Sequence, residues 1–134
     1  MSVANDTYAI KRELSISFDE ADARVREELQ KEGFGVLTEI DVTATMKKKL
    51  DVDFRPYRIL GACNPPLAYQ ALTEETDIGL LLPCNLVVYA GDTPGTSVVA
   101  ALDPKLQLAV SGRDDIGPLA DEVKARLERV VAAL

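Results

Sequence analysis

The stretch that decides the fold extends from Tyr57 to Tyr89 and has the sequence YRILGACNPPLAYQALTEETDIGLLLPCNLVVY. It contains two apolar runs, each typical of a buried β-strand, with a helical pattern between them. The first run ends at Cys63 and the second begins at Cys84, and an asparagine follows each cysteine. These are the only two cysteines in the chain. Reactive and conformationally special residues are most concentrated here, so a candidate site has to begin with this pair.

The residues around the first cysteine predict a change from strand to helix. Asn64 is a good N-terminal cap, and Pro65 follows at the first helical position, where its missing N–H costs nothing. Apolar residues then continue at helical spacing. We therefore expect strands over 57–63 and about 84–90, with a helix after Asn64. Cys63 should lie directly before the N-terminus of that helix and face its unpaired amides.

Working outward, the N-terminal part of the chain predicts a strand followed by a long helix. Residues 7–16 alternate in part between apolar and polar side chains, as expected for a strand. Ser17 and Glu20 form a capping box, and apolar residues at helical spacing then predict an amphipathic helix over about 18–32. Gly33 is expected to end this helix as its C-terminal cap.

The rest of the pattern adds strands, short helices and a final long helix. It predicts, in order, a strand at 33–42, a short helix that starts after Asp41, a hairpin turn at 91–95, a strand at 96–102, a helix in preference to a strand at 105–110, and a last helix after Gly117-Pro118. Hairpin signals and one-sided patterning favour an α+β fold, with a mainly antiparallel sheet and helices packed on one face.

Length and composition indicate a globular protein of one domain, 1–134. No apolar run approaches the ~20 residues that span a bilayer, and residues 1–6 lack the features of a signal peptide. We therefore expect no membrane partner and a cytoplasmic location. In that reducing compartment the two cysteines are expected to be free, catalytic or metal-bound rather than joined as a structural disulfide.

Charge and histidine content exclude several classes of function. With 15 basic and 22 acidic residues, the net charge of −7 argues against binding to nucleic acid, which needs a positive surface. The chain has no histidine. Mechanisms that use a Ser-His-Asp triad, a Cys-His pair or a histidine-ligated zinc are therefore excluded. Nothing in the sequence requires a cofactor.

Whether the two cysteines meet depends on how their strands pair. Antiparallel neighbours would place Cys63 and Cys84 at the same edge of the sheet, whereas a parallel crossover would separate them by a strand length of ~20 Å. The sequence leaves both arrangements open. In a third interpretation, each cysteine is a small buried hydrophobic residue with no chemical role.

If the cysteines meet, they form a candidate thiol site. The helix N-terminus would stabilise the Cys63 thiolate and lower its pKa, which would make it a nucleophile or a ligand for a soft metal. Cys84 would be the resolving thiol or the second metal ligand. Asn64 and Asn85 could orient a carbonyl or polysulfur group on a bound ligand.

Two carboxylates form a second set of candidate residues. Glu39 and Asp41 share one face of the strand predicted at 33–42, together with Gly35 and Leu37. They could form the rim of a pocket, or Asp41 could simply cap the next helix. Because two thiolates are an incomplete ligand set, a metal at Cys63 and Cys84 would need Glu39, Asp41 or a second subunit. An enzyme based on the two carboxylates ranks lower, because no nucleophile–base pair can be named beside them.

The motifs together resemble a small prokaryotic family known as domain of unknown function 302. The matching segments are Glu32–Val42 (EGFGVLTEIDV), Lys48–Leu50 (KKL), Tyr57–Pro65 (YRILGACNP) and Leu82–Tyr89 (LPCNLVVY). The resemblance implies a β-α-β(4)-α domain, similar in plan to the TATA-box-binding protein, that forms a homodimer. It assigns no particular activity, because the family has no assigned biochemistry, and it leaves open whether the protein is an enzyme. The acidic charge speaks against DNA binding.

Two function classes remain. The first is a binding or carrier module in which Cys63 and Cys84 form a site for a sulfur species, a soft metal or a small electrophile. The second is a structural or interaction homodimer whose cysteines are core residues, with no catalytic activity.

Overall fold

The structure of the chain is a computed structural model that describes residues 4–5 and 7–134. Residues 1–3 and 6, part of the stretch in which no signal peptide is expected, lie outside this range. The secondary structure elements, in order, are β1 (Ala4–Asn5), β2 (Ala9–Leu14), α1 (Phe18–Lys31), β3 (Gly35–Asp41), α2 (Val42–Leu50), β4 (Tyr57–Cys63), α3 (Pro65–Glu74), the 3₁₀ helix η1 (Thr76–Leu81), β5 (Cys84–Ala90), β6 (Ser97–Leu102), α4 (Pro104–Ala109), the 3₁₀ helix η2 (Asp114–Ile116) and α5 (Gly117–Ala132).

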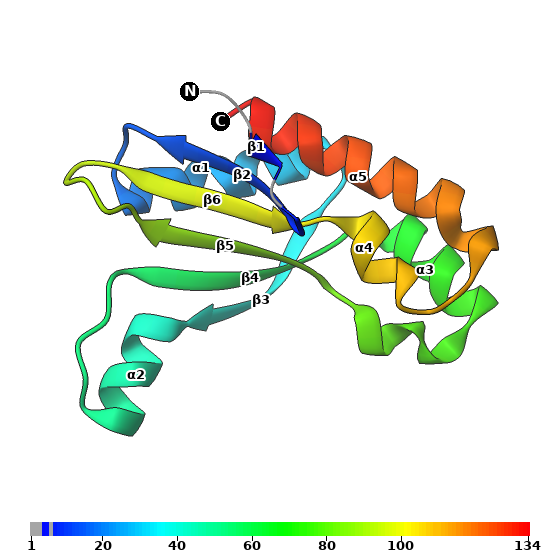
Figure 1. Ribbon diagram of the computed structural model, residues 1–134, viewed down its shortest axis with the longest axis horizontal. Coiled ribbons are helices and arrows are strands. Elements are labelled where there is room, and N and C mark those ends of the chain that lie inside the picture. Colours follow the sequence, from blue (N-terminus) through cyan, green and yellow to red (C-terminus); the bar gives the residue numbers. More distant parts are fainter. Residues whose placement is uncertain (1–3, 6) are drawn as a thin grey trace.

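The strands form one antiparallel sheet in the order β1-β2-β6-β5-β4-β3 (Figure 1). Helices α1 and α5 pack against one face of this sheet, where alternate strand residues such as Leu60, Leu86 and Val99 are fully buried. The elements β2-α1-β3-β4-β5-β6-α5 confirm the predicted α+β fold and its β-α-β(4)-α order. No helix in the described ranges has both the length and the apolar character needed to cross a membrane.

Side chains satisfy free backbone groups at the start of α1 and at the C-terminal end of α5. Ser17 Oγ accepts from the amide of Glu20 at 3.1 Å, which confirms the predicted start of α1. At the other end of the fold, Arg12 of β2 donates to the carbonyls of Val131, Ala132 and Leu134 at 3.3, 2.9 and 2.8 Å. A cation is favourable at a helix C-terminus, so Arg12 fixes the end of α5 on the sheet.

A second hydrophobic cluster lies beyond the end of the sheet. It joins α3, η1, α4 and α5 through residues such as Ala71, Ile78 and Leu108. Figure 1 shows α3 and α4 grouped beside the N-terminal part of α5, past the ends of the central strands. The helix favoured over a strand at 105–110 is confirmed as α4, and Asp103 caps it by accepting from the amide of Lys105 at 2.9 Å. This cluster and the main core leave space between them, which forms the candidate site described below.

Strand β3 differs from its predicted pattern because the register shifts between Val36 and Thr38. Val36 lies opposite Ala62, and Glu39 lies opposite Leu60, both on the helix-covered side of β4. The irregularity reverses the alternation of side chains at Leu37. The expectation that Gly35 and Leu37 share a face with Glu39 is therefore wrong.

Gly61 in the middle of β4 offers a test of this packing. A Cβ added there would overlap Thr38 Oγ1 and lie 2.8 Å from Pro83 Cγ, whereas one added at Gly35 of β3 would meet nothing within 4 Å. We expect Gly61→Ala to lower the free energy of unfolding by about 1–3 kcal/mol, because the neighbouring strands must move apart. Gly35→Ala is the matched control and should change it by less than about 0.5 kcal/mol. Urea denaturation measures both, and equal effects would contradict the packing described for β3 and β4.

Candidate functional site

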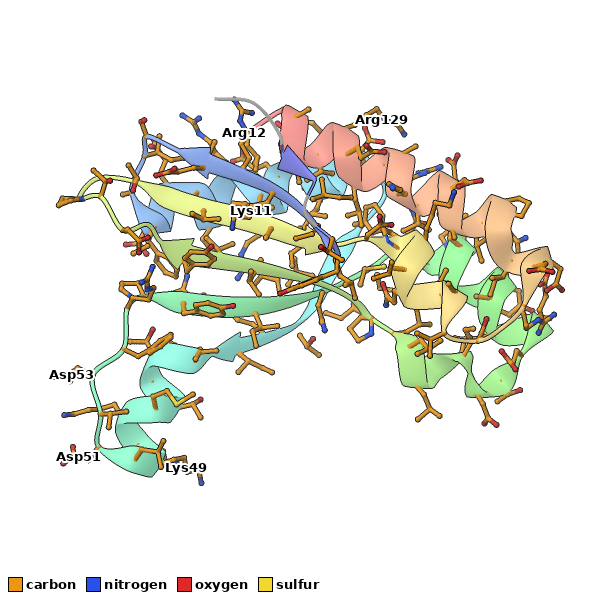
Figure 2. The ribbon with its side chains drawn as sticks, in the orientation of Figure 1. Lys11, Arg12, Lys49, Asp51, Asp53 and Arg129 are labelled. Atoms are coloured by element: carbon orange, nitrogen blue, oxygen red, sulfur yellow. The ribbon has the colours of Figure 1, made fainter. Side chains whose placement is uncertain are left out.

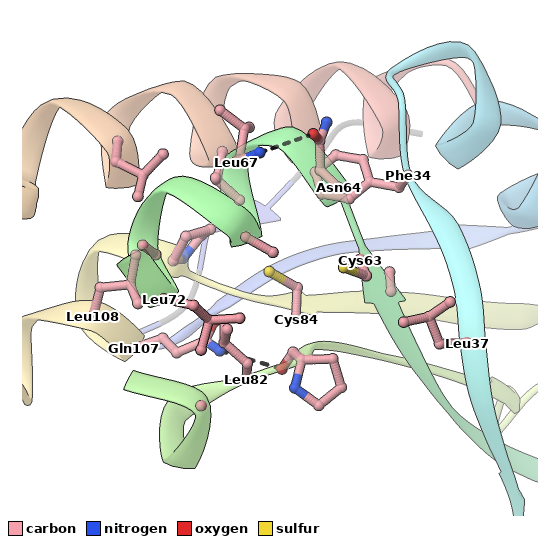
Figure 3. A pocket seen from close by; sticks show the side chains of 18 of the residues that line it. Phe34, Leu37, Cys63, Asn64, Leu67, Leu72, Leu82, Cys84, Gln107 and Leu108 are labelled. Carbon is pink, nitrogen blue, oxygen red and sulfur yellow. Dashed lines mark hydrogen bonds between the residues drawn. The ribbon is translucent and has the colours of Figure 1, made fainter. Parts of the chain in front are cut away.

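An apolar cavity of about 330 Å³ lies between the main core and the second cluster. Both cysteines line it, together with Asn64, Gln107 and mainly aliphatic side chains of α3, α4 and α5. Figure 3 shows Cys63 and Cys84 on neighbouring strands beneath α3, with Leu67 above them and Leu72 to the side of Cys84. The volume lies within the range of small-molecule sites, which begins at about 300 Å³.

The pairing of β4 with β5 determines whether Cys63 and Cys84 lie at the same edge of the sheet. The two strands are antiparallel, and Cys84 lies opposite Ala62, the residue before Cys63. Both thiols are free and half-buried. The antiparallel arrangement therefore brings the end of β4 and the start of β5 to one edge of the sheet, and both cysteines line the cavity there.

Asn64 has a structural role at the point where β4 becomes α3. Its Oδ1 accepts from the amide of Leu67 at 3.5 Å, and its Nδ2 donates to the carbonyl of Glu32 at 3.3 Å. The side chain is only 7% exposed. Cys63 is therefore held directly before the N-terminus of α3, as predicted, and the polar atoms of Asn64 are already engaged. The expectation that Cys63 faces unpaired amides is wrong, because Pro65 and Pro66 have no N–H and the amide of Leu67 is bonded to Asn64.

Burial dominates the chemistry of Cys84. It raises the pKa of the Cys84 thiol to about 11, and repulsion from a neighbouring Cys63 thiolate adds to the effect. Cys84 is therefore an uncharged S–H group at neutral pH. A thiol in this state is a weak nucleophile and a polarizable, mainly apolar part of the cavity wall.

The other predicted site residues do not reach the cavity. Asn85 lies on the opposite face of the sheet from Cys84, in a groove with Tyr57 and Tyr89. Asp41 caps α2 by accepting from the amide of Ala44 at 2.9 Å. Of the two roles predicted for Asp41, the structure therefore shows the helix cap and not the pocket rim.

Glu39 belongs to an ion-pair cluster on the face of the sheet that carries α1. It binds Arg26 at 2.7 Å and Arg58 at 3.3 Å, and both arginines also contact the nearly buried Asp22, at 2.9 and 3.4 Å. The cluster ties α1 to β3 and β4. Glu39 therefore has a structural partner set that is separate from the thiols.

The arrangement limits what metal could bind. Across residues 4–5 and 7–134 there is no group of three or more Cys, Asp, Glu or His side chains that could hold an ion. A metal at Cys63 and Cys84 would have two ligands from this chain, and Cys84 would first have to lose its proton.

Sequence reasoning missed Gln107. It comes from α4 and is only 8% exposed, in a helix whose neighbouring Pro104 and Leu108 are buried. One signal in the sequence could have identified it. Gln107 lies three residues after Pro104 and directly before Leu108, so a helix at 105–110 places this polar side chain on the same buried face as Pro104 and Leu108. The aliphatic wall was also missed, because its members come from elements far apart in the sequence.

Fold and site together define an α+β protein whose antiparallel sheet ends at an apolar cavity lined by two free thiols. Residues 10–134 match the family described as "Domain of unknown function DUF302", and the chain belongs to this family. It is also similar to a solved protein described as "uncharacterized conserved protein DUF302 from Bacillus stearothermophilus". The two share 31% sequence identity and a TM-score of 0.85, over 94% of this chain and 97% of the other. Comparison with curated proteins gives no match.

The raised pKa of Cys84 predicts an unusual pH dependence for its alkylation. The rate with iodoacetamide should rise about tenfold per pH unit from pH 7 to about pH 10 without a plateau, because only the thiolate reacts. In Cys63→Ser the pKa should fall below its wild-type value but stay above the ordinary one, since burial is the larger cause. Peptide mass spectrometry at each pH measures the rate. The urea-unfolded chain is the control, and the same profile for folded and unfolded protein would contradict the burial of this thiol.

Proposed function

We propose that the 134 residues form one domain that binds or carries a small uncharged molecule in the cavity beside Cys63 and Cys84. The observation that supports this most strongly is that the only two cysteines of the chain line one apolar cavity of about 330 Å³. The proposal includes a cytoplasmic location, because free thiols persist in a reducing compartment.

The cavity wall favours an uncharged ligand. Its aliphatic side chains, including Leu67, Leu72 and Leu82, offer no partner for a charge, and an unpaired ion is costly to remove from water. Its two sulfur atoms are soft and polarizable. A neutral sulfur species or a small apolar electrophile therefore fits the site better than an ionic metabolite.

The two thiols have different roles in this proposal. Cys84 remains protonated near neutral pH and contributes packing and a weak S–H donor. Cys63 is half-buried and is the thiol expected to react first with an electrophile, because burial keeps Cys84 protonated. A soft metal ion is the less favoured ligand, because this chain would supply two thiolates and one of them is costly to ionise.

Thiol reagents of matched reactivity test the proposal. Methyl methanethiolsulfonate is small and uncharged, whereas its sulfonatoethyl analogue has the same reactive group and a negative charge. We expect the folded protein to prefer the uncharged reagent at least about tenfold more strongly than the urea-unfolded chain does, because the cavity excludes charge. Mass spectrometry of Cys63 and Cys84 gives the two rates.

Two neighbouring residues of α3 provide a variant and its control. Ala68 lines the cavity, so Ala68→Phe should fill it and reduce the preference for the uncharged reagent. Tyr69 is 74% exposed, so Tyr69→Phe should leave the preference unchanged. A folded wild-type protein with the same preference as the unfolded chain would contradict the proposal and favour cysteines with a purely structural role. If the cysteines are purely structural, replacing Cys63 and Cys84 by alanine would lower the stability of the protein without any loss of ligand binding.

A second candidate function is homodimerisation, and α2 is the observation that favours it. None of the nine residues of α2 is buried against the described part of the chain. A helix this short is marginal without a packing partner. Leu50 of this helix is exposed, and so are apolar residues just before and after it, namely Ile40, Val52 and Phe54. Figure 2 shows Lys49, Asp51 and Asp53 on this segment, which projects from the sheet.

The uncovered face of the sheet would be the centre of such a dimer. It forms a groove with Val87 and Leu102, and the rings of Tyr57 and Tyr89 stack there with centroids 5.3 Å apart. An open, partly aromatic face beside an unsupported helix fits a second copy of the same chain, because both exposed surfaces would be covered at once.

A charge on the open face tests the dimer. Val87→Glu should convert a dimer into a monomer, since a carboxylate would be buried without a partner. Tyr69→Glu, on exposed α3, is the control and should remain dimeric. Analytical ultracentrifugation gives the mass of each, and a monomeric wild-type protein would exclude this function.

A further inference from the structure

Gln107 is one of the residues that line the cavity, and its side chain contains a buried hydrogen-bond acceptor without a partner among the described residues. Its Nε2 donates to the carbonyl of Leu81 and, at 3.2 Å, to that of Pro83. Its Oε1 is buried and has no hydrogen-bond partner in the described part of the chain. Figure 3 shows this side chain reaching from α4 toward Leu82 on the cavity wall.

The hydrogen bonds fix which way the Gln107 amide is turned. Both of its partners are backbone carbonyls, which only accept, so the nitrogen must face them. The oxygen is then directed away from Leu81 and Pro83. A buried acceptor without a donor destabilises the protein, and no donor from the described residues offsets this effect.

Two other polar side chains line the wall, Thr38 and Asn64, and neither is a buried group without a partner. Thr38 is exposed, so water can satisfy its hydroxyl. Asn64 uses its oxygen to cap α3 and its nitrogen to bind Glu32. The two thiols are weak donors and weak acceptors. Gln107 Oε1 is therefore the group with the greatest unused capacity to orient a ligand.

From these contacts we propose that the ligand is a compact apolar molecule that carries one hydrogen-bond donor, a hydroxyl or an N–H, which it gives to Gln107 Oε1. This inference rests on the proposed function, because it names the ligand class of the same cavity. A cavity of about 150 Å³ can hold benzene. One of about 330 Å³ has room for two rings or a chain of similar volume.

A pair of probes with the same shape tests the acceptor. Indole has two fused rings and an N–H donor, whereas benzothiophene has the same shape with sulfur in place of the N–H. Because benzothiophene is the more hydrophobic of the two, the relevant quantity is the ratio of their dissociation constants compared between proteins. Isothermal titration calorimetry measures both constants for the wild type, Gln107→Met and Leu72→Met.

We expect Gln107→Met to shift this ratio about tenfold toward benzothiophene, since it removes the acceptor and keeps the side-chain volume. Leu72→Met changes the wall without affecting the acceptor and should leave the ratio unchanged. The same ratio in wild type and Gln107→Met would overturn the inference, although a cavity that binds both probes would leave the proposed function intact. If neither probe binds the wild type, both the inference and the proposed function are overturned.

Gln107→Met also removes the bonds to Leu81 and Pro83, so the wild-type protein supplies a second measurement that does not depend on how well the variant folds. An NMR cross-relaxation contact between the N–H proton of bound indole and the side-chain amide of Gln107 is expected. Bound indole without this contact would overturn the inference.

Discussion

The carbonyl oxygen of Glu32, at the end of α1, is the point on which the arrangement of the site depends. It accepts hydrogen bonds from Asn64 Nδ2 at 3.3 Å and from Arg126 Nη1 at 2.8 Å. These two donors come from the start of α3 and from α5, so one backbone group links three helices. Gly33 makes the approach possible: its φ is +85°, and a Cβ there would lie 2.9 Å from Asn64 Nδ2. The same contact holds Cys63, the residue before Asn64, at the wall of the cavity.

The cavity exists because two hydrophobic clusters meet without filling the space between them. The main core is closed by α1 and α5 on the sheet, while the second cluster is closed by α3, α4 and η1 beyond its end. At the junction α3 presents Ala68 and Ala71, which are too small to reach the thiols. Empty apolar volume costs stability, because the lining atoms lose packing contacts. A ligand that fills this space would therefore stabilise the fold as well as occupy a site.

The charged side chains that join secondary structure elements lie away from the two thiols. Arg58 binds Asp22 and Glu39 on the side that carries α1, and Arg12 holds the last turn of α5. Near the cysteines the wall is aliphatic, and burial keeps Cys84 protonated. The site thus combines soft sulfur atoms, one buried amide oxygen and little else that is polar. This composition suits the recognition of an uncharged molecule and gives no support to hydrolytic chemistry.

Local signals in the sequence determined the elements of the fold. The capping residues Ser17, Asp41 and Asn64 each lie at the start of the helix that they predict, because capping depends only on nearby backbone groups. Strand and helix periods likewise gave the β-α-β(4)-α order. The resemblance in the cysteine motifs identified the family, which the match over residues 10–134 confirms.

Tertiary structure alone decided which candidates form a site. The sequence left the pairing of the two cysteine strands open, and the antiparallel register placed both thiols at one cavity. It could not separate Asn85 from Cys84, although alternation along β5 sends their side chains to opposite faces of the sheet. The register shift after Val36 and the unpaired oxygen of Gln107 depend on contacts between distant segments. Local patterns predict how each segment folds, but only packing determines which side chains from distant segments share one space.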